Sequence, residues 1–304
     1  GWQVPSSDVH LVADVVTGIS EVLRVVTDVG DGVVIEPPVY PPFAATVRGL
    51  GRRVVPAPLS GGAADLRPDL EAIERAYASG ARAHLLCSPH NPTGFVYRPA
   101  MLARIAELAD AHGVFVLADE VHAPLTLPGA THTPFPMASP AARRRSIVLT
   151  SASKTWNVAG LKAAVIVACD DAPRAVLAKL PPGTPYHAGH FGVLATRAAF
   201  REGGPWLSDV VAILDRNRHS LGDLLQAELP DVGYSAPEAG YLAWLDCRAL
   251  GLGPDPARVF LQRGRVALSS GPTFGVEGEG FARLNFATPI HLLEEAVRRM
   301  KRSL

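Results

Sequence analysis

The chain has 304 residues, of which 48% are apolar and 19% are charged, and its formal net charge is zero. This balance predicts a compact, enzyme-sized globule, and with no basic tract interleaved with aromatic residues nothing indicates nucleic acid or an anionic membrane as a partner. No apolar run is long enough to span a bilayer, and the three cysteines lie far apart in apolar runs. We therefore expect a cytoplasmic protein with reduced thiols and no membrane partner.

Short apolar runs alternate with helical patterns in the first half of the chain. The candidate strands are 32–37, 52–57, 83–88, 114–119, 146–151 and 163–168, and the candidate helices between them are 69–79 and 100–112. These strands are continuously apolar rather than alternating, which indicates burial on both faces. The pattern predicts an α/β chain with a mostly parallel sheet between helices.

The remainder of the chain has a different order of elements. A long helical pattern at 206–229 precedes shorter candidate strands at 241–246, 265–269 and 281–286 and a terminal helix at 290–302. This order favours a smaller α+β domain built on a connecting helix. We place the boundary near residue 210, which gives a large domain at 1–210 and a small C-terminal domain at 211–304.

Polar residues follow three of the predicted strands. Asn91 comes after 83–88, Asp119 ends 114–119, and Lys154 comes after 146–151. Ligands of a parallel sheet collect beyond the carboxyl ends of its strands, so these side chains mark a candidate site. Only four of the 29 basic residues are lysines, and two of them, Lys154 and Lys162, lie in one short stretch. An amine, unlike a guanidinium, can lose a proton and form a Schiff base with a carbonyl, which is the role that we predict for Lys154.

Several motifs carry a family resemblance. They are, in chain order, "VVTGIS" (15–20), "PPVYPPF" (37–43), "SPHNPTG" (88–94), "LADEVH" (117–122), "SASKTWNVAGLK" (151–162), "PEAGYLAWLD" (237–246) and "FARLNFATP" (281–289). With these motifs the chain resembles the pyridoxal-phosphate (PLP) enzymes of fold type I. Within that class it is most similar to the MalY/PatB-type cystathionine β-lyases and cysteine-conjugate C–S lyases of the aminotransferase class I/II superfamily. The resemblance implies a large domain with a seven-stranded, mostly parallel sheet, and PLP as the cofactor.

The resemblance also implies roles for the residues at the strand ends. Lys154 would bind PLP covalently and later move the substrate's α-proton. Asp119 would face the pyridine nitrogen and keep it protonated, so that the ring becomes an electron sink. Asn91 would donate its amide to the phenolic oxygen of the ring and lie beside the substrate.

Further residues would surround the cofactor and the substrate. The phosphate would be bound by the start of a helix and by side chains near the lysine, namely Val16, Thr17, Gly18, Ser151, Ser153 and Lys162. Tyr40 would stack on the cofactor ring next to the substrate, and His122 would also contact the cofactor. Arg283 lies on an otherwise apolar strand and would bind the substrate's α-carboxylate. We expect no metal, because no set of ligands with suitable spacing accompanies His122 and Glu120.

The function that the resemblance implies is β-elimination from cysteine thioethers such as cystathionine or S-conjugates, which yields thiol, pyruvate and ammonia. Two alternatives remain open. An aminotransferase would use the same residues, and a catalytically idle member of the group would keep the fold for binding or regulation. The resemblance further implies a small amino-acid substrate and a homodimer. Family members also carry an N-terminal segment, with an arm and a tyrosine for the partner's site, that has no counterpart in these 304 residues.

Overall fold

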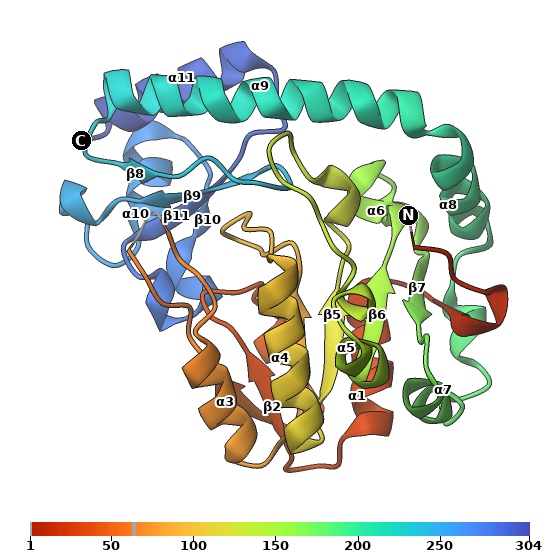
Figure 1. The fold of residues 1–304 in the computed structure, drawn as a ribbon. Helices are drawn as coiled ribbons and strands as arrows, with labels where there is room; N and C mark the ends of the chain where they lie inside the picture. Colours follow the sequence, from red (N-terminus) through yellow and green to blue (C-terminus); the bar gives the residue numbers. More distant parts are fainter. Residues whose placement is uncertain (1, 63–64) are drawn as a thin grey trace.

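A computed structural model describes residues 2–62 and 65–304. Two sheets organise this structure, and helices surround both of them (Figure 1). The larger sheet contains strands from the first 170 residues of the chain, and the smaller sheet contains strands from the last third. The long helix α9 (Gly204–Glu228) runs across the top of the molecule between the two parts (Figure 1).

The larger sheet has seven strands in the order β1-β7-β6-β5-β4-β2-β3. The strands are β1 (Val9–Val12), β2 (Gly32–Ile35), β3 (Arg53–Pro56), β4 (Ala81–Cys87), β5 (Phe115–Asp119), β6 (Ser146–Thr150) and β7 (Ala164–Val167). The pairs from β3 to β6 are parallel, whereas β7 is antiparallel to both β6 and β1. The sheet is therefore mostly parallel, as the apolar runs predicted, and its central strands deliver their carboxyl ends to one edge.

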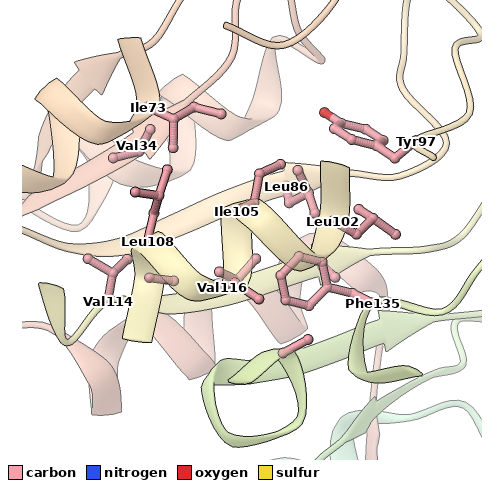
Figure 2. Close-up of a cluster of buried hydrophobic side chains, with 14 of the residues drawn as sticks. Val34, Ile73, Leu86, Tyr97, Leu102, Ile105, Leu108, Val114, Val116 and Phe135 are labelled. Carbon is pink, nitrogen blue, oxygen red and sulfur yellow. The ribbon is translucent and has the colours of Figure 1, made fainter. Parts of the chain in front are cut away.

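Helices cover both faces of this sheet, because successive side chains of each strand point to opposite faces. Val34 and Leu86 pack against α3 (Leu70–Ala78) and α4 (Pro99–His112), in the cluster that Figure 2 shows. Their neighbours Val33 and Leu85 pack on the other face, against α1 (Val15–Val26) and α2 (Pro42–Gly49). The other helices of this part are α5 (Pro140–Arg145), α6 (Ala152–Thr155), α7 (Asp171–Leu177) and α8 (His190–Glu202).

The smaller sheet is antiparallel, with four strands in the order β10-β11-β9-β8. The strands are β8 (Gly233–Tyr234), β9 (Leu242–Asp246), β10 (Ser269–Ser270) and β11 (Phe281–Asn285), and they are accompanied by α10 (Pro256–Val259) and α11 (Ile290–Arg302). Its apolar side chains form a core with α9 and α11, including Leu221, Leu245 and Val297. This arrangement confirms the predicted fold class of a large α/β part and a smaller α+β part.

Most predicted elements are present, with small shifts at their ends. The prediction at 265–269 was wrong for most of its length, because residues 260–264 form a wide helical turn and the strand is limited to Ser269 and Ser270. Strand β1 had no prediction, since its four residues do not form a continuous apolar run. The proposed boundary at residues 210 and 211 falls inside α9, so the division into two domains stays a prediction. Among the described residues, no helix is long and apolar enough to cross a membrane.

The core against α4 allows a direct test of packing. Ile105 is completely buried, whereas its neighbour Arg104 is exposed and pairs with Glu107 on the same helix. We expect Ile105→Ala to lower the free energy of unfolding by about 2–5 kcal/mol, because the lost methyl groups leave a cavity. Arg104→Ala, the control, should cost less than about 1 kcal/mol. Urea denaturation followed by circular dichroism measures both, and equal effects would contradict the assigned packing.

Candidate active site

The candidate site lies at the carboxyl edge of the larger sheet. Strands β4, β5 and β6 are parallel neighbours, with Cys87 opposite Asp119 and Asp119 opposite Leu149. The segments that follow these strands therefore start at the same edge. They carry Asn91 in the turn after β4, Asp119 at the end of β5 and Lys154 in α6 after β6.

Asp119 is a buried carboxyl group with a raised pKa. One of its oxygens accepts a hydrogen bond from the Val121 N–H at 3.1 Å. Burial raises the pKa of Asp119 to about 7, against the smaller lowering effects of that N–H and of the nearby Lys154 charge. A buried carboxylate is costly without a cation beside it, so this position favours a positively charged partner.

Lys154 is half-buried in the short helix α6, which Ser151 caps. The Ser151 hydroxyl accepts the Ser153 N–H at 3.0 Å and donates to the Ala163 carbonyl at 2.7 Å. These bonds fix the start of α6 against the segment that leads into β7. Lys154 is therefore held one helical turn from the end of β6, where its charge acts on Asp119.

Asn91 and Arg283 join the two parts of the molecule. Arg283 Nη1 donates to Asn91 Oδ1 at 2.9 Å, and Arg283 Nη2 donates to the Ser269 hydroxyl at 3.2 Å. Because a guanidinium has only donors, it requires the oxygen of the Asn91 amide to face it. The Asn91 NH₂ group must then point away from Arg283 and is available as a donor elsewhere.

The start of α1 forms a small network of charges beside the sheet. Asp14 caps this helix, with Oδ1 accepting the Thr17 N–H at 2.7 Å, and its Oδ2 accepts from Lys162 Nζ at 3.0 Å. The Gly18 N–H is also used, since it donates to the Asp14 carbonyl at 2.9 Å. Burial alone would raise the pKa of Asp14, but the Thr17 N–H and Lys162 together hold it below its usual value.

The sequence prediction for this helix start named Val16, Thr17, Gly18 and Lys162. The structure brings Thr17 and Lys162 together through Asp14, and Val16 lies in the first turn of the same helix. Gly18 has a packing reason as well, because a Cβ at this position would lie 2.8 Å from Leu149 Cδ2. The Thr17 N–H and the Lys162 amine both donate to the Asp14 carboxylate, and the anion site at this helix start stays a prediction.

His122 lies in the loop after β5, three residues beyond Asp119. It is buried, its ring lies 5.8 Å from that of Tyr241, and its Nδ1 has no partner among the described residues. Burial, together with the smaller effects of the Lys154 and Arg283 charges, lowers the pKa of His122 to about 4. The ring is therefore neutral at ordinary pH, with one nitrogen able to donate and the other able to accept.

Tyr40 is the last of the predicted site residues. It precedes α2 and is half-buried, with its ring edge-on to Phe43 at 5.9 Å between centroids. Burial raises the pKa of the Tyr40 phenol, and the carboxylate of Asp119 raises it further while Arg283 lowers it. Tyr40 therefore lies within electrostatic reach of both Asp119 and Arg283.

Glu120 is accounted for by local structure. Its carboxylate accepts the Phe135 N–H at 2.7 Å and lies 3.2 Å from His132 Nε2, so it stabilises the loop after β5. Within residues 2–62 and 65–304, no group of three or more histidine, cysteine or acidic side chains could hold a metal ion.

Sequence reasoning missed four residues of this region: Asp14, Tyr241, Ser269 and Phe274. Asp14 carried a signal, since an aspartate directly before an apolar helical run is a typical N-cap. Tyr241 lies within "PEAGYLAWLD", but nothing in that motif says that Tyr241 lies near Arg283. Burial lowers the pKa of Arg283, and Tyr241 opposes part of that lowering. Ser269 and Phe274 contact Arg283 only because β10 and the turn after it fold beside β11.

The chain matches one family and several known proteins over nearly all of its length. The family described as "Aminotransferase class I and II" matches residues 4–300. A Mycobacterium tuberculosis protein named "Putative cystathionine beta-lyase" is 47% identical over all of this chain and 80% of its own length. The "Cystathionine beta-lyase PatB" of Bacillus subtilis is 36% identical over all of this chain and 79% of its own length. A solved "PLP-bound C-S lyase from Staphylococcus hominis" has a TM-score of 0.92 at 26% identity, covering all of this chain and 78% of that one.

The seven-stranded sheet, with a lysine, an acid and an asparagine at its carboxyl edge, defines a PLP-dependent enzyme of fold type I, which confirms the resemblance drawn from the motifs. The chain belongs to the aminotransferase class I and II family. The roles assigned to individual site residues stay predictions.

The buried carboxyl of Asp119 predicts a pH dependence of stability in the cofactor-free protein. Its pKa is about 7 in the folded chain against an ordinary 3.8, so the folded state binds the proton more tightly and stability falls as pH rises between these values. Asp119→Asn removes this effect. From pH 5 to pH 8 the wild type should lose about 2 kcal/mol of unfolding free energy relative to Asp119→Asn.

Denaturation of both cofactor-free proteins in urea at pH 5 and pH 8 measures this difference. All other titrating groups are common to the two proteins, so their contributions cancel. A stability difference that is equal at the two pH values would contradict the raised pKa.

Proposed function

We propose that this enzyme is a C–S β-lyase that converts a cysteine thioether and water into a thiol, pyruvate and ammonia. The observation that carries the proposal is the similarity, over the whole chain, to relatives that are 36% and 47% identical and named cystathionine beta-lyase. The solved C–S lyase with the same fold adds support. The family includes aminotransferases, and the similarity favours the lyase over that alternative.

The site has the chemistry that PLP requires. Bound PLP supplies an electron sink, which accepts the electron pair left when the α-proton of an amino acid is removed. Asp119 is the buried acid that would face the protonated pyridine nitrogen, and a cation there would lower the raised pKa of this carboxyl. The Asn91 NH₂, turned away from Arg283, would donate to the phenolic oxygen of the cofactor.

Lys154 would hold the cofactor and move the proton. Its amine would bind the cofactor's aldehyde carbon until substrate amine replaces it, and it would then take the substrate's α-proton. The neutral ring of His122, whose Nδ1 has no hydrogen-bond partner among the described residues, would contact the cofactor without adding a charge. Removal of the α-proton would allow the β-thiolate to leave.

Arg283 would bind the α-carboxylate of the substrate. Its guanidinium is already oriented by Asn91 and Ser269, which leaves other N–H groups for a carboxylate. Tyr40 would stack on the cofactor ring and lie beside the substrate, together with Asn91. These contacts would hold the amino acid with its α-carbon toward Lys154.

The cofactor's phosphate would be bound by the first turn of α1, by Lys162 and by the hydroxyls of Ser151 and Ser153. The Ser151 hydroxyl now donates its one proton to the Ala163 carbonyl, so it would have to release that carbonyl to donate to the phosphate. Helix starts favour anions because their N–H groups point outward and the helix dipole is positive there. Asp14 now bonds to both Thr17 and Lys162, so phosphate binding would require Lys162 to turn from this carboxylate. Lys162 is 60% exposed and free to do so.

A homodimer is the assembly that we propose. Several large apolar side chains of α8 and its neighbours are exposed, which is unusual for a surface that faces only water. They are Leu161, Tyr186, Phe191, Leu194, Phe200 and Trp206. Helix α8 lies at the side of the molecule, at the right in Figure 1, and a second copy would cover it.

We also propose a cytoplasmic location. The three cysteines, Cys87, Cys169 and Cys247, are all free and buried. Burial raises the pKa of the Cys169 thiol to about 11 and that of Cys247 to about 12, so neither is a reactive thiolate. Unpaired structural thiols fit a reducing compartment.

The lyase proposal is tested by incubating PLP-saturated protein with S-methyl-L-cysteine or L-cystathionine and no keto acid. Sustained release of equal amounts of thiol and pyruvate is expected. A single half-turnover that leaves the cofactor in its amine form would identify an aminotransferase instead and overturn the proposal.

Lys154→Ala provides the matched test of the lysine. It should retain the fold but lose activity by at least about a thousandfold, because no other group takes the α-proton. Lys179→Ala is the control, since this lysine is exposed in the loop that follows α7. Borohydride reduction of wild-type holoenzyme, followed by peptide mapping, should label Lys154, and an unlabelled Lys154 would support the catalytically idle alternative.

The dimer is tested by light scattering after gel filtration. The wild type should have twice the mass of one chain, and Phe191→Asp should shift it toward the monomer, because a charge would be buried in the interface. Val29→Asp is the control, since Val29 is as exposed as Phe191, at 78%, but lies in the turn after α1. A monomeric wild type would refute the assembly.

A further inference from the structure

Arg283 is held from three sides. It lies in β11, with Ser269 of β10 and Trp244 of β9 as its partners on the neighbouring strands. Its two terminal nitrogens donate to Asn91 and Ser269. On its third side the guanidinium carbon lies 4.8 Å from the centre of the Phe274 ring, which is the distance of a cation–π contact.

The Phe274 ring is itself immobilised by aromatic packing. It is only 3% exposed and meets Trp244 edge-on, with 5.2 Å between the ring centres. Trp244 in turn stacks on Phe281, with ring centres 5.2 Å apart and planes within 6° of parallel. Rings packed in this way keep one orientation, so the face that Phe274 presents to Arg283 is fixed.

The backbone of Phe274 is tied to the other side of the site. Its carbonyl accepts a hydrogen bond at 3.0 Å from the N–H of Val39, the residue before Tyr40. The next residue, Gly275, has φ +128°, and a Cβ there would lie 3.0 Å from Pro37 Cβ. The turn that contains Phe274 is therefore packed directly on the turn that carries Tyr40. Position 275 has no room for a side chain larger than that of glycine.

We propose that Phe274 is a positioning residue for Arg283: its ring face sets the plane of the guanidinium, so that the free N–H groups are aligned with the substrate's α-carboxylate. A bidentate contact between arginine and a carboxylate depends on this plane, because both groups are flat. The negative face of the ring also offsets the loss of water around Arg283, whose pKa burial lowers. Phe274 does this without touching the substrate.

An aliphatic side chain could fill much of the same space but could not orient the guanidinium. Leucine has nearly the volume needed at position 274, but it has no flat face and no quadrupole to attract a cation. Phe274→Leu should therefore leave the fold intact while the guanidinium loses its fixed plane. The role of Phe274 rests on the proposed function in one respect, namely that the ligand is an amino acid with an α-carboxylate.

The experiment compares two ligands of PLP-saturated protein: S-methyl-L-cysteine and its decarboxylated analogue, S-methylcysteamine. Their apparent dissociation constants are measured from the absorbance change of the cofactor. Phe274→Leu should weaken the carboxylated ligand about tenfold and leave the decarboxylated one unchanged, since only the former uses Arg283. In turnover, the KM should rise with little change in kcat, and Phe274→Tyr, which restores an aromatic face, should recover most of the affinity.

Phe281→Leu is the matched control. It removes a ring from the same aromatic cluster but not the one that lies against Arg283, so it should lower the melting temperature and reduce the preference for the carboxylate much less than Phe274→Leu does. Equal weakening of both ligands by Phe274→Leu would overturn the proposal. So would an equal loss of carboxylate preference in Phe281→Leu, or no loss in Phe274→Leu.

The two proposals fail in different ways. If the wild type binds S-methyl-L-cysteine but releases no thiol and pyruvate, the lyase proposal fails, while the comparison of the two ligands still decides the role of Phe274. If Phe274→Leu does not fold, as judged by its melting curve, Phe274→Met keeps an unbranched apolar side chain at this position and takes its place in the same comparison.

Discussion

The hydrogen bond between Arg283 and Asn91 is the contact on which the candidate site depends. It joins residues that are 192 positions apart in the chain, one on the smaller sheet and one on the turn after β4 of the larger sheet. Because it fixes both the direction of the guanidinium and the orientation of the Asn91 amide, it links the group that would bind substrate to the group that would bind cofactor. Further bonds from Glu238 and Ala239 to the Gly94 carbonyl hold the same turn against the smaller sheet's part of the chain.

Charged groups are costly to bury, so each ionisable group of the site either has partners that stabilise its charge or has a pKa shifted toward its neutral form. Arg283 has hydrogen bonds and an aromatic face, which offset the loss of water around its charge. Asp119 has one N–H donor and a raised pKa, and His122 is neutral with an unpartnered nitrogen among the described residues. Groups whose protonation is shifted by burial, gathered at the end of parallel strands, are typical of a catalytic site rather than of a structural network.

The fold was largely predictable because its signals are local. Continuous apolar runs such as 83–88 and 114–119 indicated strands buried on both faces, and α4 and α11 appear within a residue of their predicted ranges. The failures have physical causes. Residues 265–268 have strand-like composition, but the wide turn at 260–264 and the left-handed backbone of Arg265 prevent them from pairing. Strand β1 pairs with β7 at the edge of the sheet, and this contact joins segments more than 150 residues apart, which no local pattern records.

The candidate site was predictable only where its residues lie at the ends of strands. The prediction that Asn91, Asp119 and Lys154 come from neighbouring strand ends was possible because topology alone brings the ends of parallel strands together. The occupation of the α1 start by Asp14, and the contacts of Ser269 and Phe274 with Arg283, depend on how distant segments pack, which no spacing in the chain records.

The sequence by itself determined the class of fold, the family and which polar residues lie at the carboxyl ends of the strands, because these follow from local hydrophobic pattern and from motifs within single segments. Only the tertiary structure decided which way the Asn91 amide points, which pKa values burial shifts and which side chains orient Arg283. Those properties arise from groups that come within a few ångströms of one another only when the chain has folded and water has been excluded.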